Sequence, residues 1–192
     1  MKVLFSALAL SLSLSSWAAT DICSVSYQSE GSKLNWTAFK TPAKVGVNGQ
    51  FTTFTVKSTK ANNVDGLLAG ASFDVDTKSI STNDKARDAK IFQFFFKQMV
   101  KGTAITGKVV KVNASDVEVD FTINGTTKKV TLVKKYDESK NTVTLNGAIN
   151  VLDFGMKANL DSLTKACGVL HEGVTWPDVN IELVASVPKS CK

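Results

Sequence analysis

The stretch ASFDVDTKSISTNDKARDAKIFQFFF, residues 71–96, changes its hydrophobic period halfway. In its first half, apolar residues alternate with polar ones, starting from Ala71, Phe73 and Val75, which predicts a half-buried β-strand. After a polar turn, apolar residues recur with helical spacing, which predicts an amphipathic helix over 84–100. The apolar face of this helix comprises Phe92, Phe95, Phe96, Met99 and Val100. Either packed side chains or an apolar ligand must fill the large volume that this aromatic face contacts.

Most of the chain shows the two-residue period of antiparallel sheets. The clearest case is 116–123, where Val117, Val119 and Phe121 alternate with polar residues. One face of each such segment is expected to be buried and the other wet. The predicted strands are 33–39, 50–57, 70–80, 102–112, 116–123, 128–136, 142–154 and 178–187.

Short turns connect these segments, and Asn124–Gly125 is the strongest hairpin signal among them. A second amphipathic pattern over 157–167 predicts a shorter helix before the last strand. We therefore predict an all-β fold in which eight antiparallel strands close into a barrel, with one helix inserted between strands 3 and 4. A barrel of this size either fills with side chains or holds one ligand. A two-sheet sandwich is the competing architecture.

The first residues have the form of a secretory signal peptide. Lys2 supplies the positive charge, an apolar run follows, and small residues at Ala18 and Ala19 suit cleavage. The run is too short to span a bilayer, and the residues before Cys23 are not those that lipid attachment requires. We expect a signal peptide over 1–19 and one exported domain over 20–192.

The chain is mildly basic, with a formal net charge of +6. Four lysines near one predicted hairpin favour transient contact with an anionic membrane surface, although a solvated outer face of the barrel is the preferred interpretation. These are Lys128, Lys129, Lys134 and Lys135. An exported chain without a basic and aromatic platform is not expected to bind nucleic acid.

No catalytic residue and no metal ligand are predicted. His171 is the only histidine, and no closely spaced cysteine pair accompanies it, which argues against a zinc site and against a Cys–His or serine triad. Thr82, Asn83 or Asp84 is expected to cap the predicted helix. For Asp84, Arg87 and Asp88, capping and a local ion pair are a better explanation than catalysis.

Five motifs in order resemble those of the YceI-like family. They are S-I-S-T-N-D-K-A-R-D-A-K-I with F-F-F within 73–96, V-N-G-Q-F at 47–51, F-T-I-N-G-T-T-K-K-V at 121–130, D-F-G-M at 153–156 and W-P-D-V-N-I-E-L at 176–183. The resemblance implies an eight-stranded lipocalin-like barrel, commonly exported to the periplasm, that binds a long isoprenoid or another fatty amphiphile and has no known reaction. The chain departs from the family in having little histidine around 83–88, which leaves the head-group chemistry open.

The inward-facing apolar residues are the predicted ligand site, with a bound lipid as the ligand and no other cofactor. They are Trp36, Phe51, Phe73, Val75, Phe92, Phe95, Phe96, Met99, Phe121, Leu132, Leu145, Phe154 and Leu183. The alternative is that they pack together in a non-enzymatic stress or structural protein that acts through a protein partner. The sequence does not give the oligomeric state, and a dimer is one option. Exchange of a ligand is expected to be gated by the insert over 84–100.

Three cysteines in an oxidising compartment allow one disulfide and leave one thiol. If the first and last strands pair antiparallel, Cys23 and Cys191 meet. A bond between Cys23 and Cys167 is the other pairing considered.

Overall fold

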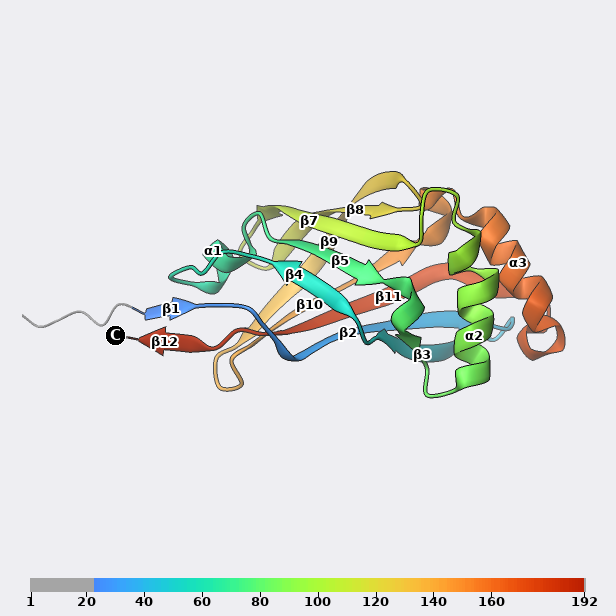
Figure 1. Ribbon diagram of the computed structural model, residues 1–192, viewed down its shortest axis with the longest axis horizontal. Helices are drawn as coiled ribbons and strands as arrows, with labels where there is room; N and C mark the ends of the chain where they lie inside the picture. The colour runs from blue at the N-terminus through green and yellow to red at the C-terminus, as the bar shows by residue number, and fades with distance from the viewer. Residues whose placement is uncertain (1–22, 192) are drawn as a thin grey trace, which may run out of the picture.

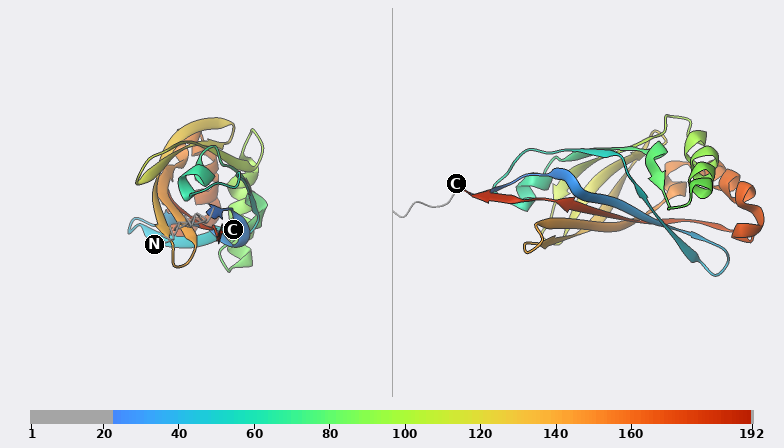
Figure 2. Two further views of the ribbon diagram at one scale, coloured as in Figure 1. Left: turned by 90° about the vertical axis from the view of Figure 1, so that its left-hand side faces the viewer. Right: turned by 60° about the horizontal axis from the view of Figure 1, so that its bottom comes forward.

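The computed structural model describes residues 23–191, so the predicted signal peptide over 1–19 lies outside the described residues. An antiparallel sheet of ten strands, in the order β4-β5-β7-β8-β9-β10-β11-β2-β3-β6, curves into a barrel-like wall (Figures 1 and 2). Its strands are β2 (Gln28–Lys40), β3 (Val45–Phe51), β4 (Phe54–Lys57), β5 (Ser72–Asp76), β6 (Ile80–Ser81), β7 (Ala104–Val112), β8 (Asp116–Ile123), β9 (Thr126–Asp137), β10 (Thr142–Asn150) and β11 (Thr175–Ser186). The sheet accounts for most of the described chain, as the alternating sequence pattern predicts.

The helices gather mainly at one end of the wall. Figure 1 shows α2 and α3 side by side at the end opposite β1 (Cys23–Val25) and β12 (Lys189–Cys191). The helices are α1 (Val64–Leu68), α2 (Lys85–Phe94) and α3 (Lys157–Cys167), with short 3-10 turns η1 (Thr77–Ser79), η2 (Phe96–Gln98), η3 (Val151–Phe154) and η4 (Gly168–His171). Among residues 23–191, no helix has both the length and the apolar character needed to cross a membrane.

The predicted count of eight strands is wrong, because two predicted strands are interrupted. The segment 50–57 breaks at residues 52–53, where the chain stops pairing with β2 and begins to pair with β5. The segment 70–80 breaks at η1, where the Asp76 side chain accepts a hydrogen bond from the Lys78 N–H. Backbone bonds from the Thr52 N–H to the Ser79 carbonyl and from the Asp76 N–H to the Thr53 carbonyl link the two breaks. The two ends of the sheet order, β4 and β6, therefore meet at this corner.

The helices also differ from the prediction. The helix expected over 84–100 ends at Phe94 and continues only as η2, and Val100 is exposed rather than part of an apolar face. The Val100 N–H instead bonds to the Asn124 side chain of the β8–β9 turn, which fixes the chain after the helix. Helix α1 was not predicted, because its five residues are too few to show a period.

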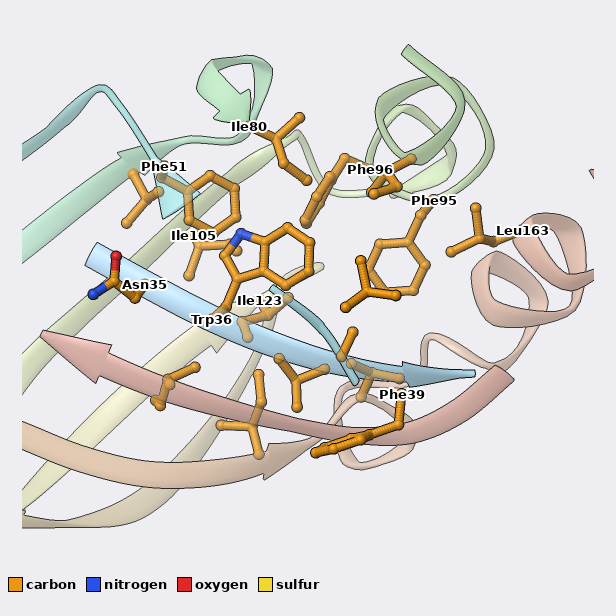
Figure 3. Close-up of a pocket in the computed structure, with 18 of the residues that line it drawn as sticks. Asn35, Trp36, Phe39, Phe51, Ile80, Phe95, Phe96, Ile105, Ile123 and Leu163 are labelled. Carbon is orange, nitrogen blue, oxygen red and sulfur yellow. The ribbon is translucent and has the colours of Figure 1, made fainter. Parts of the chain in front are cut away.

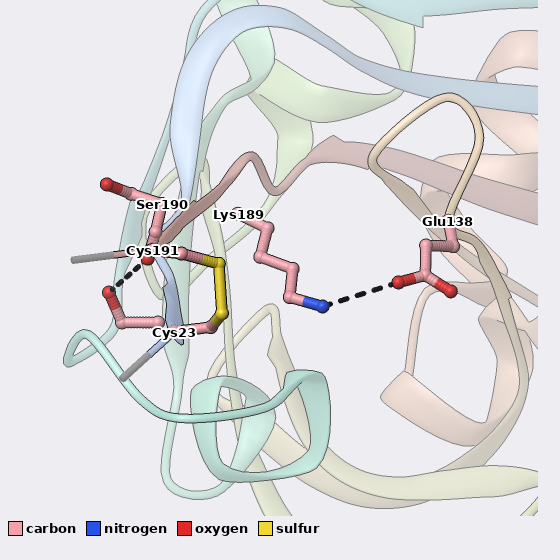
Figure 4. Close-up of a disulfide and its surroundings, with 6 residues drawn as sticks. Cys23, Glu138, Lys189, Ser190 and Cys191 are labelled. Atoms are coloured by element: carbon pink, nitrogen blue, oxygen red, sulfur yellow. Dashed lines mark hydrogen bonds and ion pairs between the residues drawn. A yellow bond between two sulfur atoms is a disulfide. The ribbon is translucent and has the colours of Figure 1, made fainter. Parts of the chain in front are cut away.

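The first and last described residues pair in a separate two-stranded ladder of β1 (Cys23–Val25) and β12 (Lys189–Cys191) (Figure 4). Cys23 and Cys191 are directly paired in the register and form a disulfide across a sequence separation of 168 residues. Cys167 carries a free thiol. The structure therefore has the Cys23–Cys191 pairing rather than the Cys23–Cys167 alternative. The reason is that the strands carrying Cys23 and Cys191 pair antiparallel.

The interior divides into two parts along the strands. The part nearer the termini, here called the disulfide half, is filled by buried aliphatic side chains: Val25, Leu67, Leu68, Val109, Val117, Val119, Leu132, Val143, Ala185 and Val187. The part beneath α2 and α3, here called the helical half, contains a cavity. One strand can contribute to both halves: Val117 and Val119 of β8 pack in the disulfide half, and Phe121 of the same strand lines the cavity.

Candidate functional site

The cavity of the helical half has a volume of about 460 Å³. Figure 3 shows Trp36 and Phe51 from the strands and Phe95 and Phe96 from the helical cover around a common space. Such a volume lies within the range of small-molecule sites in proteins. The lining is predominantly aliphatic and aromatic, so the site is suited to an apolar molecule rather than a polar one.

The structure brings nine of the thirteen predicted site residues to this cavity and leaves four outside it. The nine are Trp36, Phe51, Phe73, Val75, Phe95, Phe96, Phe121, Leu145 and Leu183. The other four are Phe92, Met99, Leu132 and Phe154, which pack in the core instead. Leu132 belongs to the disulfide half. The face of α2 that lines the cavity includes Arg87 and Ile91 and continues to Phe95, so Phe92 lies on another face of the helix. Contact of any of these residues with a ligand stays a prediction.

Sequence reasoning missed part of the lining. Ile105 of β7 and Ile149 of β10 lie on the inward faces of predicted strands, so the alternation already contained the signal for them. Leu160 and Leu163 of α3 and Leu170 of η4 line the cavity because α3 folds across its end. The helical period of α3 identifies its apolar face, but only the fold shows what that face covers.

Two glycines let aromatic rings lie flat against the wall. Gly49 is the cross-strand partner of Trp36, and Gly107 is the partner of Phe73. A Cβ atom at Gly49 would overlap the indole of Trp36, and one at Gly107 would overlap the ring of Phe73. Each ring therefore occupies the space that a neighbouring side chain would take, and the centre of the barrel stays open.

Aromatic contacts connect the wall to the helical cover. Phe51 of β3 packs edge to face on Phe96 with ring centroids 5.7 Å apart, and Phe96 packs on Phe95 at 5.1 Å. Such contacts stabilise beyond the area they bury. The indole N–H of Trp36 has no acceptor within residues 23–191, so packing alone holds this ring.

One buried hydrogen bond fastens the two helices over the cavity. The side chain of Asn159 in α3 is buried, and its amide donates to the backbone carbonyl of Phe95 at 2.9 Å. Phe95 is the C-cap residue that directly follows α2, so the bond holds a cavity-lining position. Satisfying a carbonyl left free at a helix end in this way stabilises the closed cover.

The start of α2 is held by Thr82 and Asp84. Of the three predicted cap candidates, Asp84 caps the helix by accepting a hydrogen bond from the Arg87 N–H at 3.0 Å. No ion pair among residues 23–191 joins Arg87 to Asp84 or Asp88, so the local ion pair predicted for these three residues does not form. Asp88 instead accepts from the N–H and hydroxyl of Thr82, and the Arg87 guanidinium donates to the hydroxyl and carbonyl of Thr82. These bonds are structural, so this turn offers no acid–base pair.

Polar groups meet the cavity at its helical end. Thr175 of β11 shares its hydroxyl with the His171 ring at 2.7 Å and with the Thr164 hydroxyl at 2.8 Å. Burial lowers the pKa of His171, and the charges of Lys40 and Lys90 lower it further. Burial raises the pKa of the Cys167 thiol, while the same two lysines oppose that rise. At neutral pH the imidazole and the thiol are therefore mainly uncharged.

Within the described residues, no group of three or more His, Cys, Asp or Glu side chains is placed to hold a metal ion. The cavity-lining carboxylate, Asp84, is engaged as a helix cap. The arrangement can therefore enclose and orient an amphiphile, and the polar groups at its end are placed to contact a head group.

The family model described as the YceI-like domain matches residues 26–186. The structure is similar to that of a polyisoprenoid binding domain from Saccharophagus degradans implicated in plant cell wall breakdown, with a TM-score of 0.62, 15% identity and coverage of 86% of this chain and 97% of that one. It is also similar to BcnA from Burkholderia cenocepacia, with a TM-score of 0.57, 16% identity and coverage of 85% and 99%.

The YceI protein of Campylobacter jejuni matches with a TM-score of 0.51, 18% identity and coverage of 77% of this chain and 86% of that one. No curated protein sequence matches the chain. At these identities the structural likenesses bear on the fold alone.

Proposed function

The chain belongs to the YceI-like domain family, and on this premise we propose that it binds a long-chain isoprenoid or another amphipathic lipid in its barrel-like interior and sequesters or carries it. The cavity of about 460 Å³ with its apolar, aromatic lining is the observation that carries the proposal. The polyisoprenoid binding described for the Saccharophagus degradans domain is consistent with it. No chemical step is part of the proposal.

The binding energy comes from removing the tail from water. Each buried methylene contributes about 0.8 kcal/mol, so a tail of about ten carbons contributes about 8 kcal/mol before the cost of association is subtracted, and a longer tail binds correspondingly more tightly. The flat rings on Gly49 and Gly107 keep this volume available. A barrel that serves only as a packed scaffold for a protein partner has no need of such a space.

We also propose that the protein is exported to the periplasm. A disulfide between Cys23 and Cys191 suits an oxidising compartment. Together with the predicted signal peptide over 1–19, this supports export to the periplasm. There the protein would shield an apolar molecule that water does not dissolve.

We further propose that the helical cover gates exchange. Phe95 and Phe96 line the cavity from the cover, and the bond from Asn159 to Phe95 holds them in place. Asn159→Ala removes this bond and is expected to accelerate release of a bound fatty probe several-fold. Asp161→Ala on the exposed face of α3 is the matched control, and equal release rates in both variants would contradict gating by this contact.

Transient contact with an anionic membrane surface is proposed at the helical end rather than at the lysine-rich hairpin. Lys129 pairs with Glu118 and Lys134 pairs with Asp65, which breaks up the predicted cluster. At the helical end, Val169 and Leu170 of η4 are 93% and 64% exposed. Val169→Glu should reduce sedimentation with anionic vesicles, and unchanged sedimentation would contradict contact at this turn.

The experiment that tests lipid binding is mass spectrometry of an organic extract from protein expressed with its full sequence and purified from the periplasm. A stoichiometric isoprenoid or fatty species is the expected result. Phe95→Glu, which places a charge in the lining, should abolish the species. Phe94→Glu is the matched control, because Phe94 directly precedes Phe95 in sequence but does not line the cavity and is 36% exposed.

An empty extract, combined with no uptake of added long-chain lipids, would contradict lipid binding and favour the alternative of a partner-binding scaffold. Loss of the lipid from both variants would show only that the helix had unfolded, so circular dichroism of each variant accompanies the extraction.

A further inference from the structure

Charge in the cavity lining is confined to the helical end. The lining residues with ionisable side chains are Lys40, Asp84, Arg87, Lys90, Cys167 and His171. They lie at the end of β2, at the N-cap and along the first six residues of α2, and around the end of α3. Asp84, Lys90 and Leu170 line the cavity and are also exposed to solvent, so the cavity opens here. The remainder of the lining is apolar apart from Asn35 and Thr175.

Within the described part of the chain, Lys40 and Lys90 form no ion pair with a carboxylate. Every ion pair among residues 23–191 involves another lysine: Lys44, Lys111, Lys129, Lys134, Lys140, Lys157 or Lys189. Lys40 is half-buried and pairs through its backbone with Thr175, while Lys90 projects from α2. Both lysines line the same end of the cavity as His171 and Cys167, and their charges lower the pKa of both of these groups.

Among the described residues, the one carboxylate that lines the opening, Asp84, offsets only part of this positive charge. Asp84 is engaged by the Arg87 N–H, and this bond together with the charges of Arg87 and Lys90 lowers its pKa. Arg87 adds a third positive charge, although two of its donors are used by Thr82. His171 is neutral at pH 7. Three cations therefore face one carboxylate, and the opening carries net positive charge.

We propose that this opening is a head-group site, in which Lys40 and Lys90 bind the carboxylate or phosphate of an anionic amphiphile whose tail lies in the apolar cavity. The inference rests on the proposed function, since it assigns the polar end of the same ligand. Its physical basis is the match in polarity: an apolar interior takes the tail, and two unpaired cations at the solvent boundary take the anionic oxygens. A neutral head group of the same size gains no comparable contact.

The test compares two probes with the same tail, a dansyl-labelled undecanoic acid and its methyl ester, by fluorescence titration of the full chain. The acid is expected to bind about fivefold to tenfold more tightly than the ester at low salt, as two partly exposed charge pairs would give. Raising the salt to about 0.5 M should reduce this ratio, because screening weakens exposed charge pairs. The double variant Lys40→Gln with Lys90→Gln should lose the ratio and keep its affinity for the ester.

The double variant Lys33→Gln with Lys135→Gln is the matched control. It changes the net charge by the same amount at exposed positions outside the cavity and outside every described ion pair. It should retain the full preference for the acid. An equal loss in both double variants would overturn the assignment to Lys40 and Lys90, because it would reflect net charge alone.

The remaining outcomes separate the head-group site from the function on which it rests. If neither probe binds wild-type protein, lipid binding itself fails. If both probes bind equally at low salt, lipid binding stands and the anionic head-group site is overturned. If the lysine variant keeps the preference for the acid but no longer sediments with anionic vesicles, the two lysines contact a membrane surface instead.

Discussion

The disulfide half and the helical half are built from the same strands, yet one is packed and the other is hollow. Aliphatic residues such as Val117, Val143 and Leu132 fill the disulfide half. The larger aromatic residues, such as Trp36 and Phe73, surround the open space of the helical half. The difference shows that residue size alone does not fill a barrel. Rings that lie flat on cross-strand glycines leave its centre empty, whereas aliphatic side chains that meet across the barrel close it.

The two ends also differ in how the chain is held. A covalent bond joins β1 to β12 at one end, and the Val25–Ala61 bridge together with the pair Lys134–Asp65 ties the loop carrying α1 to the wall. At the other end, α2 and α3 are held by packing and by the bond from Asn159 to Phe95. Movement that admits a ligand is therefore expected at the helical end, which has the smaller local stability.

The largest effect is expected from removing the disulfide. The double variant Cys23→Ser with Cys191→Ser frees a loop that spans 168 residues in sequence, so the free energy of unfolding should fall by about 2–4 kcal/mol in urea titration. Cys167→Ser is the control and should be nearly neutral, because this thiol is free and only partly buried. Similar stabilities for all three proteins would contradict the view that the covalent bond stabilises the disulfide end.

Two leucines with equal burial compare the halves directly. Leu132 and Leu145 are each 4% exposed, but only Leu145 lines the cavity. Leu132→Ala opens a new void and should cost about 3 kcal/mol, whereas Leu145→Ala enlarges an existing one and should cost about 2 kcal/mol, close to the transfer contribution alone. The measurement is equilibrium urea unfolding, and a greater loss for Leu145→Ala would mean that the helical half is the more tightly packed.

The flat-ring arrangement predicts separate effects on binding and stability. Gly49→Ala forces the indole of Trp36 off the wall and toward the cavity, which should weaken binding of a long-chain probe about tenfold while costing about 1–2 kcal/mol of stability. Gly147→Ala meets Leu132 outside the cavity, so it should lower stability without changing affinity. Equal affinity in the two variants, measured by probe titration, would refute the role of Gly49 in keeping the cavity open.

The smallest effect concerns His171, the only histidine of the chain. Its folded-state pKa lies below the ordinary value of 6.5, mainly because of burial. Below pH 6.5 the unfolded chain therefore binds more protons than the folded one, and stability falls as the pH drops from 6.5 through the folded pKa. Because the ring is partly exposed, the melting temperature should fall by no more than about 2 °C.

The matched measurement is the melting temperature of His171→Gln over the same pH range. The variant should show a flatter profile than wild type between pH 5 and 7.5, since ordinary carboxyl groups titrate at about 4. An unchanged profile would mean that the helical end does not disfavour the charged ring.

The sequence alone determined much of the wall. The alternation over 116–123 predicted a strand that the structure forms over the same residues, and the helical period over 157–167 predicted α3 with the same bounds. Asp84 as a cap and the terminal cysteine pair were also accessible, because capping and strand pairing at the chain ends are local or topological properties.

Only the tertiary structure decided which inward residues surround a cavity. A two-residue period identifies the inward face of a strand, but Leu132 and Leu145 have the same pattern and lie in different halves. The position of Gly49 opposite Trp36 depends on the register between β2 and β3, and the break at residues 52–53 depends on a change of pairing partner. Lys40 and Lys90 are 50 residues apart in sequence, and only the fold brings both of them to the lining of one cavity. The volume of the cavity and the charge at its opening depend on residues from many strands and helices together, so a pattern within one sequence segment does not predict them.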